Sequence, residues 1–332
     1  MASIGIIGAG AWGTALAAHA ARNDHDVTLW SREQSVVEDV VRSRENVKYL
    51  PGVRLPKLHA STDLAAVVPG AELLIFATPA QYLREVAAQV LPHLQAQTTI
   101  AIASKGMEER SLRLMTEVLS EVWPNVAKER IAMVSGPSFA REVGRGLPTD
   151  VVAASIGKHA AHTVQRLLHA PLFRIYASED VIGVQVAGAT KNVIAIAAGA
   201  SDGLRFGHNA LAALITRGLA EITRLGVALG ARPLTFLGLA GAGDLFLTCS
   251  GDLSRNRTLG KKLAEGLDAS TYLATQTSVA EGYYTARATH ALARKLDVSM
   301  PISDQVYAVL HEGRPLLDAI RLLLTREIKD DE

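Results

Sequence analysis

The chain has 332 residues, 48% of them hydrophobic and 20% charged, with a formal net charge of +1. This composition is typical of a folded globular protein, and the near-zero charge argues against a nucleic-acid or acidic-membrane partner. Cys249 is the only cysteine, which excludes an intrachain disulfide and favours a cytoplasmic location. The histidines and the lone cysteine show no metal-ligand spacing, so no metal site is expected. The length predicts two domains.

The N-terminal pattern is a strand, a glycine-rich turn and a helix. The β-branched run 4–7 (I-G-I-I) predicts a buried strand, and the alanine-rich stretch 14–21 favours a helix. Between them, Gly8, Gly10 and Gly13 have the G-x-G-x-x-G spacing. In this context the spacing predicts a dinucleotide site, with a tight turn at Gly8, backbone approach of the pyrophosphate at Gly10 and close packing at Gly13. The alternative is a glycine-rich turn of an unrelated α/β protein.

The second strand, Asp26–Trp30, ends where NAD enzymes usually carry an acid for the ribose 2′-hydroxyl. Here Ser31 and Arg32 occupy that place, and Glu33 follows. Arg32 is suited to meet a 2′-phosphate, and the alternative is a solvated arginine in a surface loop. Glu33 either reaches the ribose or pairs with Arg32.

Strands and helices alternate up to about residue 178, which predicts an α/β fold with a Rossmann-like, doubly wound sheet. The expected strands are Leu73–Ala77, Thr99–Ala103, Ile131–Val134, Val151–Ser155 and Phe173–Tyr176, and the expected helices between them are Gln81–Leu91, Ser111–Trp123 and Ala160–Leu168. Ligands bind beyond the carboxyl ends of such strands, where Lys105 and the loop 135–138 (S-G-P-S) fall.

Only helices are expected after residue 180. They are Val181–Ser201, Asn209–Leu229, Leu253–Leu263, Ser278–Leu296 and Ser303–Glu312. We therefore expect a dinucleotide-binding domain over residues 1–179 and an all-helical, substrate-binding C-terminal domain over residues 180–332.

Two charges stand alone in apolar surroundings. Lys191 is the only charged residue of Val181–Ser201, a helix apolar on all sides, and burial would lower the pKa of a lysine toward the range of a general acid or base. Gly188, one turn earlier, would leave room for a ligand. Asp244 is the only charge between Pro233 and Gly251 and needs a partner, either Lys191 or a substrate hydroxyl. The alternatives are a snorkelling lysine and a helix N-cap.

The segment Gly251–Arg257 reads G-D-L-S-R-N-R and precedes a helix. Backbone N–H groups, a hydroxyl and a guanidinium at a helix start form a good anion site. The alternative is a capped surface helix with a basic first turn.

These segments together resemble the NAD(P)-dependent sn-glycerol-3-phosphate dehydrogenase family of the bacterial type, over essentially the whole chain. The resemblance is carried by G-A-G-A-W-G-T-A at 8–15, S-K-G at 104–106, S-G-P-S-F-A at 135–140, A-T-K-N at 189–192, L-A-G-A-G-D-L at 239–245, S-R-N at 254–256 and V-A-E-G at 279–282. It implies reversible oxidation of sn-glycerol 3-phosphate to dihydroxyacetone phosphate, usually run toward glycerol 3-phosphate for phospholipid synthesis.

The resemblance also implies the roles of individual residues. Lys191 matches the proton acceptor. Substrate-binding positions are Lys105, Gly136, Ser138, Lys191, Asn192, Asp244, Ser254, Arg255 and Asn256. Cofactor-binding positions, including the glycine turn, are Gly8, Gly10, Ala11, Trp12, Gly13, Arg32, Lys105, Ala140, Arg255, Val279 and Glu281. Relatives often have Ser at the position of Ala11, so one side-chain contact to the pyrophosphate should be missing.

The expected cofactor is therefore NAD(P)(H), with NADPH used at least as well as NADH, and the expected substrate is a small phosphorylated molecule. We expect a homodimer with no nucleic-acid partner and no stable membrane insertion. Two other functions remain open at this point. One is another two-domain dehydrogenase, acting on a 3-hydroxy acid or a sugar acid. The other is an NAD(P)-sensing regulator without turnover, which would not need Lys191.

Overall fold

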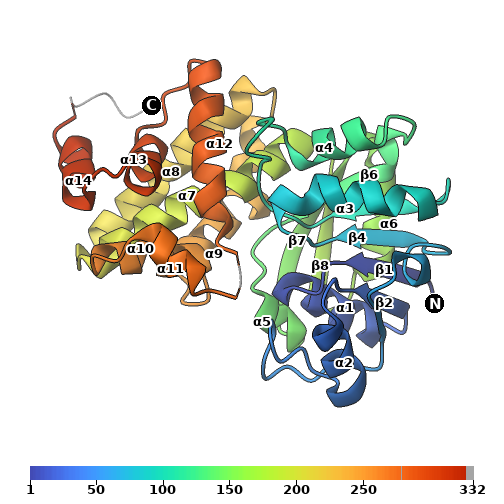
Figure 1. Ribbon diagram of the computed structural model, residues 1–332. Helices are drawn as coiled ribbons and strands as arrows, with labels where there is room; N and C mark the ends of the chain where they lie inside the picture. Colours follow the sequence, from blue (N-terminus) through green and yellow to red (C-terminus); the bar gives the residue numbers. More distant parts are fainter. Residues whose placement is uncertain (278, 327–332) are drawn as a thin grey trace.

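The computed structural model describes residues 1–277 and 279–326, which form a sheet-containing half and a helical half (Figure 1). One eight-stranded sheet has the order β3-β2-β1-β4-β5-β6-β7-β8, and all neighbouring strands are parallel except β6 and β7. The strands are β1 (Ser3–Ile7), β2 (Asp26–Trp30), β3 (His59–Ser61), β4 (Leu73–Phe76), β5 (Thr99–Ile102), β6 (Ile131–Ser135), β7 (Thr149–Ser155) and β8 (Phe173–Ser178). The strand order reverses at β1 and β4, and ligands of such sheets bind beside this reversal.

Helices cover both faces of the sheet, so its central strands are apolar on both sides. In β4, Leu73 and Ile75 pack with the helices of one face, and Leu74 and Phe76 pack with those of the other. The helices of this half are α1 (Ala11–Arg22), α2 (Gln34–Ser43), α3 (Leu83–Val90), α4 (Met115–Val122), α5 (Ala140–Gly144) and α6 (His159–Leu168). The expected Rossmann-like fold is confirmed.

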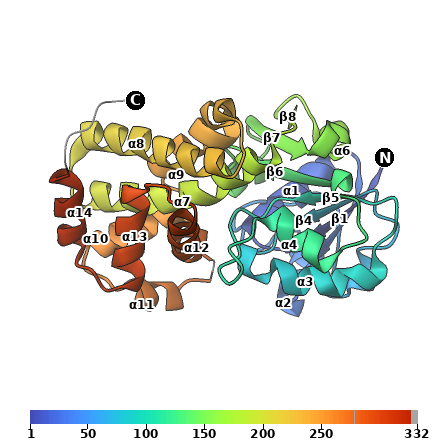
Figure 2. The same ribbon diagram turned by 90° about the horizontal axis from the view of Figure 1, so that it is seen from above.

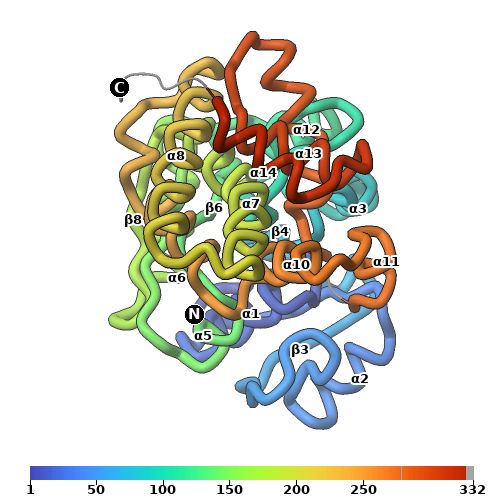
Figure 3. Tube along the Cα trace, turned by 90° about the vertical axis from the view of Figure 1, so that its left-hand side faces the viewer, coloured from blue at the N-terminus to red at the C-terminus, as the bar shows by residue number. Residues whose placement is uncertain are grey.

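The helical half is built around α7 (Val181–Gly203), which α8, α9, α10, α12 and α13 contact (Figures 2 and 3). Its other helices are α8 (Gly207–Ala228), α9 (Asp244–Ser250), α10 (Arg255–Ala264), α11 (Ala269–Ala274), α12 (Glu281–Lys295), α13 (Pro301–His311) and α14 (Leu316–Leu324). By length and composition α7 passes for a membrane span, but 83% of its most apolar stretch is buried inside the structure. It is therefore the core helix of this half.

Several details of the sequence-based prediction were wrong or incomplete. The helix expected from Ser111 begins only at Met115, since Leu112 has a φ of 60°, which is not helical. The helix expected from Ser278 begins at Glu281, and Ser278 itself lies outside the described residues. The sequence pattern did not predict β3, α2, α5, α9, α11 or α14, most of which are short. It also gave no sign that β7 runs antiparallel, because an apolar run carries no direction.

The three glycines of the first turn have different surroundings. Gly8 has a φ of +116°, and a Cβ there would lie 2.9 Å from backbone atoms of Ala77. A Cβ at Gly13 would lie 1.9 Å from the carbonyl oxygen of Gly8, whereas Gly10 has no heavy atom within 4 Å of such a position. Gly8 and Gly13 are therefore required by the turn itself. Gly10 borders open space at the N-terminus of α1.

Gly13→Ala should lower the free energy of unfolding by about 1–3 kcal/mol or more, the usual cost of overpacking, because its Cβ overlaps a backbone oxygen. Gly10→Ala is the matched control, since Gly10 has an ordinary φ of −69° and free space around it. Urea unfolding of the two variants measures the difference. Equal stabilities would contradict this account of the turn.

Candidate functional site

A buried carboxylate between two lysines lies where the two halves of the molecule meet. Lys191 of α7 donates from Nζ to Asp244 Oδ1 at 2.8 Å, and Lys105, just after β5, donates to Asp244 Oδ2 at 2.7 Å. Lys191 also donates to Thr248 Oγ1, one turn after Asp244 in α9, at 2.6 Å. Asp244 is 1% exposed and Lys191 6%. The sequence predicted Lys191 as a possible partner of Asp244 but not Lys105.

Burial and charge act against each other in this cluster. Burial raises the pKa of the Asp244 carboxyl, but the ammonium groups of Lys105 and Lys191 outweigh it and hold the pKa below its usual value. Burial lowers the pKa of Lys105, opposed by the attraction of Asp244. With both lysines charged, two positive groups share one negative group. The remaining positive charge is placed to stabilise an oxygen anion or a phosphate.

The loop after β6 completes the surroundings of Lys105. The Gly136 carbonyl oxygen accepts from Lys105 Nζ at 2.9 Å and from Ser138 Oγ at 2.8 Å. Gly136 has a φ of +140°, and a Cβ there would lie 2.9 Å from Val151 Cα, so only glycine fits. Ala140 is half-buried at the start of α5. Lys105, Gly136 and Ser138 therefore lie together at this loop. Ala140 is the first residue of α5, two residues after Ser138.

Gly188 does not leave room for a ligand, which corrects our expectation. A Cβ at Gly188 would lie 2.6 Å from Ser135 Oγ and 3.7 Å from Lys105 Cγ. The missing side chain instead lets α7 pack against the end of β6 and the stem of Lys105. This close approach brings Lys191 and Lys105 to one carboxylate.

Two asparagines join three helices beside the lysines. Asn256 Nδ2 donates to Asn192 Oδ1 at 2.9 Å, and Asn256 Oδ1 accepts from the backbone N–H of Gly282 at 2.9 Å. Because that N–H can only donate, the orientation of the Asn256 amide is fixed. Asn192 of α7, Asn256 of α10 and the start of α12 are thus held together.

The first turn of α10 carries two arginines, one paired within the fold and one exposed to solvent. Ser254 is the N-cap, and its Oγ accepts from Arg257 N at 3.2 Å. The Arg257 guanidinium pairs with Asp252 at 2.6 Å and with Asp202 at 2.9 Å. Arg255 is exposed and forms no ion pair within the described part of the chain. Arg255 is therefore the cation of this helix start that a ligand can use.

Glu281 connects the first turn of α12 to the sheet-containing half. Its Oε1 accepts from Ala80 N at 3.1 Å, just after β4, and burial raises the pKa of the carboxyl to about 7. Its Oε2 has no hydrogen-bond partner in the described chain. Val279 is half-buried two residues earlier. A carboxylate oxygen without a partner at this junction suits a hydroxyl or amide donor on a ligand.

Arg32 lies apart from the lysines, at the end of β2, with its guanidinium carbon 5.8 Å from the centre of the Tyr82 ring. Glu33 forms no ion pair with Arg32 in the described chain, and Lys48 and Tyr49 both donate to its carboxylate. Two strands separate β2 from β5, so three strand spacings, roughly 14 Å, lie between Arg32 and Lys105. An elongated ligand lying along the sheet edge would reach both.

The residues present fit a dinucleotide. The N-terminus of α1 has no side-chain cap, and Gly10 leaves its backbone accessible. Helix N-termini of this kind bind phosphate groups. Near the same strand ends, four buried polar atoms lack hydrogen-bond partners in the described chain. A polar ligand would provide these partners. The four atoms are Trp12 Nε1, Thr78 Oγ1, Ser135 Oγ and Glu281 Oε2.

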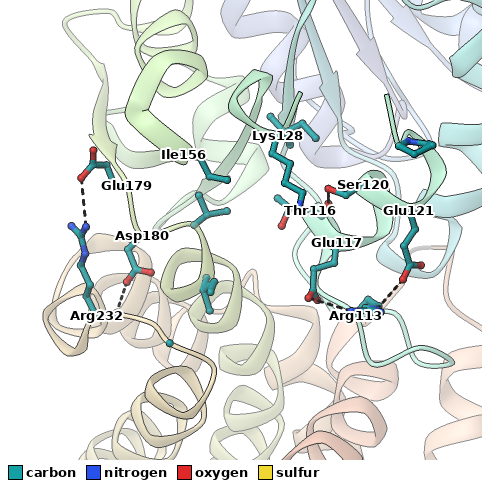
Figure 4. A pocket seen from close by; sticks show the side chains of 15 residues that line it. Arg113, Thr116, Glu117, Ser120, Glu121, Lys128, Ile156, Glu179, Asp180 and Arg232 are labelled. Atoms are coloured by element: carbon teal, nitrogen blue, oxygen red, sulfur yellow. Dashed lines mark hydrogen bonds and ion pairs between the residues drawn. The ribbon is translucent and has the colours of Figure 1, made fainter. Parts of the chain in front are cut away.

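Two cavities lie elsewhere. One, of about 660 Å³, lies between α4 and the connection from β8 to α7, and its lining includes Lys128, Glu179, Asp180 and Arg232 (Figure 4). The other is a largely apolar groove of about 800 Å³ between α7, α8, α13 and α14. None of the residues that the sequence singled out for the site lines either cavity.

Sequence reasoning missed four contributors to this region: Thr248 as a partner of Lys191, Ser135 opposite Gly188, Tyr82 under Arg32, and Gln81 beside the Lys105 loop. The hydroxyl of Thr248 follows Asp244 by four residues, so helical spacing was a usable signal. The other contacts join segments far apart in the chain, and no local pattern announces them.

Known proteins share both halves of this arrangement. Residues 3–161 match the family model described as the N-terminus of NAD-dependent glycerol-3-phosphate dehydrogenase, and residues 180–321 match that of its C-terminus. A Geobacter sulfurreducens protein named glycerol-3-phosphate dehydrogenase (NAD(P)+) is 50% identical over 98% of each chain. One of the same name from Anaeromyxobacter dehalogenans is 48% identical, also over 98% of each.

The solved structure of glycerol-3-phosphate dehydrogenase from Coxiella burnetii has a TM-score of 0.93 and 41% identity, covering 98% of this chain and 99% of that one. A ketopantoate reductase from Ralstonia eutropha, 16% identical with a TM-score of 0.59 over 93% of this chain and 97% of that one, shares the fold alone. Both halves thus match one family, and the match runs nearly from end to end. This chain belongs to the NAD-dependent glycerol-3-phosphate dehydrogenase family.

Proposed function

We propose that this chain interconverts sn-glycerol 3-phosphate and dihydroxyacetone phosphate with NAD(P)(H), and that it supplies glycerol 3-phosphate for glycerophospholipid synthesis. The observation that carries the proposal is the pair of lysines on the buried Asp244. The start of α10, capped by Ser254, follows Asp244 in the chain and is suited to an anion. Such a site can polarise an oxygen and hold a phosphate in the same molecule. The names of the two relatives described above support the same reaction.

The nicotinamide cofactor supplies the hydride exchanged with C2 of the substrate. Lys191 gives a proton from Nζ to the C2 oxygen in the reductive direction and takes it back in the oxidative one. Asp244 orients Lys191 and balances its charge, and Lys105 adds a second ammonium near the developing oxygen anion. Thr248 fixes the Lys191 ammonium from the other side.

Arg255 and the N-terminus of α10 hold the substrate phosphate, with Ser254 capping the helix and Asn256 linking it to Asn192. Gly136 and Ser138 border the substrate beside Lys105. The cofactor pyrophosphate binds at the glycine turn, which comprises Gly8, Gly10, Ala11, Trp12 and Gly13. The remainder of the cofactor site is lined by Lys105, Ala140, Arg255, Val279 and Glu281. We retain the domain boundary near residue 179, in the short connection between β8 and α7.

The proposal is tested by following the oxidation of NADH or NADPH in the presence of dihydroxyacetone phosphate. Rapid oxidation is expected. A 3-hydroxy acid or sugar acid oxidised with NAD(P)+ in its place would show a different dehydrogenase. Cofactor binding without turnover of any of these substrates would show a regulator.

Lys191→Ala should fold and bind cofactor but lose turnover by about two to four orders of magnitude, the range for general acid–base groups. Asp244 keeps Lys105 as a partner in this variant, so no buried charge is left unpaired. Lys261→Ala, which removes a surface lysine paired with Asp202, is the control and should keep full activity. A kcat near that of the wild type in Lys191→Ala would remove Lys191 from the mechanism.

Arg255→Ala should raise KM for dihydroxyacetone phosphate about 10- to 100-fold, since a hydrogen bond to a charged group contributes about 1.5–3 kcal/mol. The effect falls on KM because substrate and transition state share the phosphate contact. Arg257→Ala is the matched control: its guanidinium is already paired with Asp202 and Asp252, so it should lower thermal stability and change KM little. If Arg255→Ala lowers only kcat, Arg255 is not the phosphate anchor.

We also propose that NADPH is used at least as well as NADH, with a preference that salt weakens. Lys48 and Tyr49 hold Glu33, so the acid that would repel a 2′-phosphate is neutralised beside Arg32. Arg32→Ala should lower kcat/KM for NADPH and leave that for NADH nearly unchanged. Equal losses for both coenzymes would show that Arg32 does not read the 2′ position. A strong wild-type preference for NADH would assign that role to Glu33.

Finally, we propose a cytoplasmic homodimer without stable membrane insertion. Exposed apolar side chains near α8 and on α14, such as Phe206, Leu317 and Leu324, are of the kind that a second copy covers. The long apolar helix α7 is already buried within the chain. Light scattering after size-exclusion chromatography measures the mass directly, and a monomer at micromolar concentration would argue against the dimer.

A further inference from the structure

The connection between β5 and α4, residues 103–114, carries Lys105, so its backbone decides where the Lys105 ammonium lies. The contacts with Gly136 O and Asp244 hold only the tip of a long, flexible side chain. Near Lys105 the connection packs on the segment that follows β4. Ser104 Oγ donates to Thr78 O at 2.5 Å, and a Cβ at Gly106 would lie 2.5 Å from Ala80 Cβ.

Gln81 holds the next part of the connection. Its Nε2 donates to Met107 O at 2.7 Å, and its Oε1 accepts from Glu109 N at 2.9 Å. Glu109 N can only donate, which fixes the orientation of the Gln81 amide. One half-buried side chain therefore satisfies backbone groups two and four residues beyond Lys105, groups that would otherwise need other partners.

The 3₁₀ turn Ala80–Tyr82, which contains Gln81, also touches two residues assigned to the cofactor. Ala80 N donates to Glu281 Oε1, and the Tyr82 ring lies against Arg32. The three successive residues of this turn thus contact α12, the Lys105 connection and the end of β2.

We infer that Gln81 is a positioning residue for Lys105: its amide holds the backbone of the connection so that the Lys105 ammonium meets Asp244 and the Gly136 carbonyl. The inference rests on the proposed function, in which Lys105 acts beside Lys191. Gln81 itself touches neither the lysine ammonium groups nor Asp244. Its effect passes through the backbone of residues 107–109.

Gln81→Leu removes both hydrogen bonds and keeps most of the volume. Displacement of a reacting group by about 1 Å can cost up to about 100-fold in rate, so we expect kcat to fall about 10- to 100-fold. The KM values for dihydroxyacetone phosphate and coenzyme should change little. Gln165→Leu is the matched control, because the equally half-buried Gln165 donates to Ile175 O at 2.7 Å beside β8, at the edge of the sheet. It should keep the wild-type kcat.

Gln81→Glu gives a readout that a merely structural role would not move. The protonated acid still donates to Met107 O, whereas the ionised acid places negative charge against that carbonyl. The ratio of variant to wild-type kcat should therefore fall as pH rises from about 5 to about 8, past the usual range of a glutamate. The charged groups on the elements around this position are Arg84, Glu108, Glu109, Glu281 and Arg287. They are present in both proteins, so their own titration, including that of Glu281 with its pKa of about 7, contributes to both rates.

A ratio that does not change with pH would overturn the inference, and so would a wild-type kcat in Gln81→Leu. If Gln81→Leu melts before it can be assayed, the pH dependence of Gln81→Glu decides alone. An active wild type with unaffected variants rejects only the role of Gln81. A wild type that does not reduce dihydroxyacetone phosphate rejects the proposed function and this role with it.

Discussion

The buried contact of Asp244 with Lys105 and Lys191 is the interaction on which the site depends. Removing three charged groups from water costs several kcal/mol for each ion, and only close pairing and further hydrogen bonds offset that cost. Here the carboxylate uses both oxygens, and each ammonium donates one further hydrogen bond, Lys191 to Thr248 and Lys105 to the Gly136 carbonyl. Lys105 belongs to the sheet-containing half and the other two to the helical half. The same contact therefore joins the halves and assembles the chemistry.

Close backbone packing makes this contact possible. α7 approaches β6 through Gly188, and it approaches α10 through Gly199, where a Cβ would lie 1.9 Å from Arg257 O. A helix apolar on all sides can be packed against on every side, which is why α7 serves as the centre of its half. Lys191, the only charged residue of α7 apart from Asp202 in its last turn, is buried and pairs with Asp244. The burial of α7 on every side thus explains both its apolar sequence and the pairing of Lys191 with Asp244.

The first turn of α10 shows how a helix start keeps a cation available. Two arginines in one N-terminal turn oppose the helix dipole. Arg257 is neutralised by Asp202 and Asp252, so its cost is offset within the fold. Arg255 has no such partner in the described chain, and Asn256 is fixed by Asn192 and Gly282. The helix start is therefore rigid on one side and open to an anion on the other.

The sequence by itself determined the elements whose signals are local. The strand, glycine turn and helix at 4–21, the alternation of apolar runs up to residue 178, and the isolation of Lys191 and Asp244 are patterns within short stretches, and they predicted the Rossmann-like sheet, the helical second half and most candidate residues. Family motifs such as A-T-K-N at 189–192 carried the resemblance that the comparisons confirmed.

Only the tertiary structure decided which distant residues meet. Lys105 and Asp244 are 139 residues apart, and their pairing follows from the order of strands and the packing of α7. Gly188, predicted to leave space for a ligand, instead admits Ser135. Contacts between distant segments also decided three other features. They are the antiparallel pairing of β7 with β6, the hydrogen bonds of Lys48 and Tyr49 to Glu33, and the contact of Gln81 with residues 107–109. A local pattern states what a segment can bury or bond, but its partner is chosen by the whole chain when it packs.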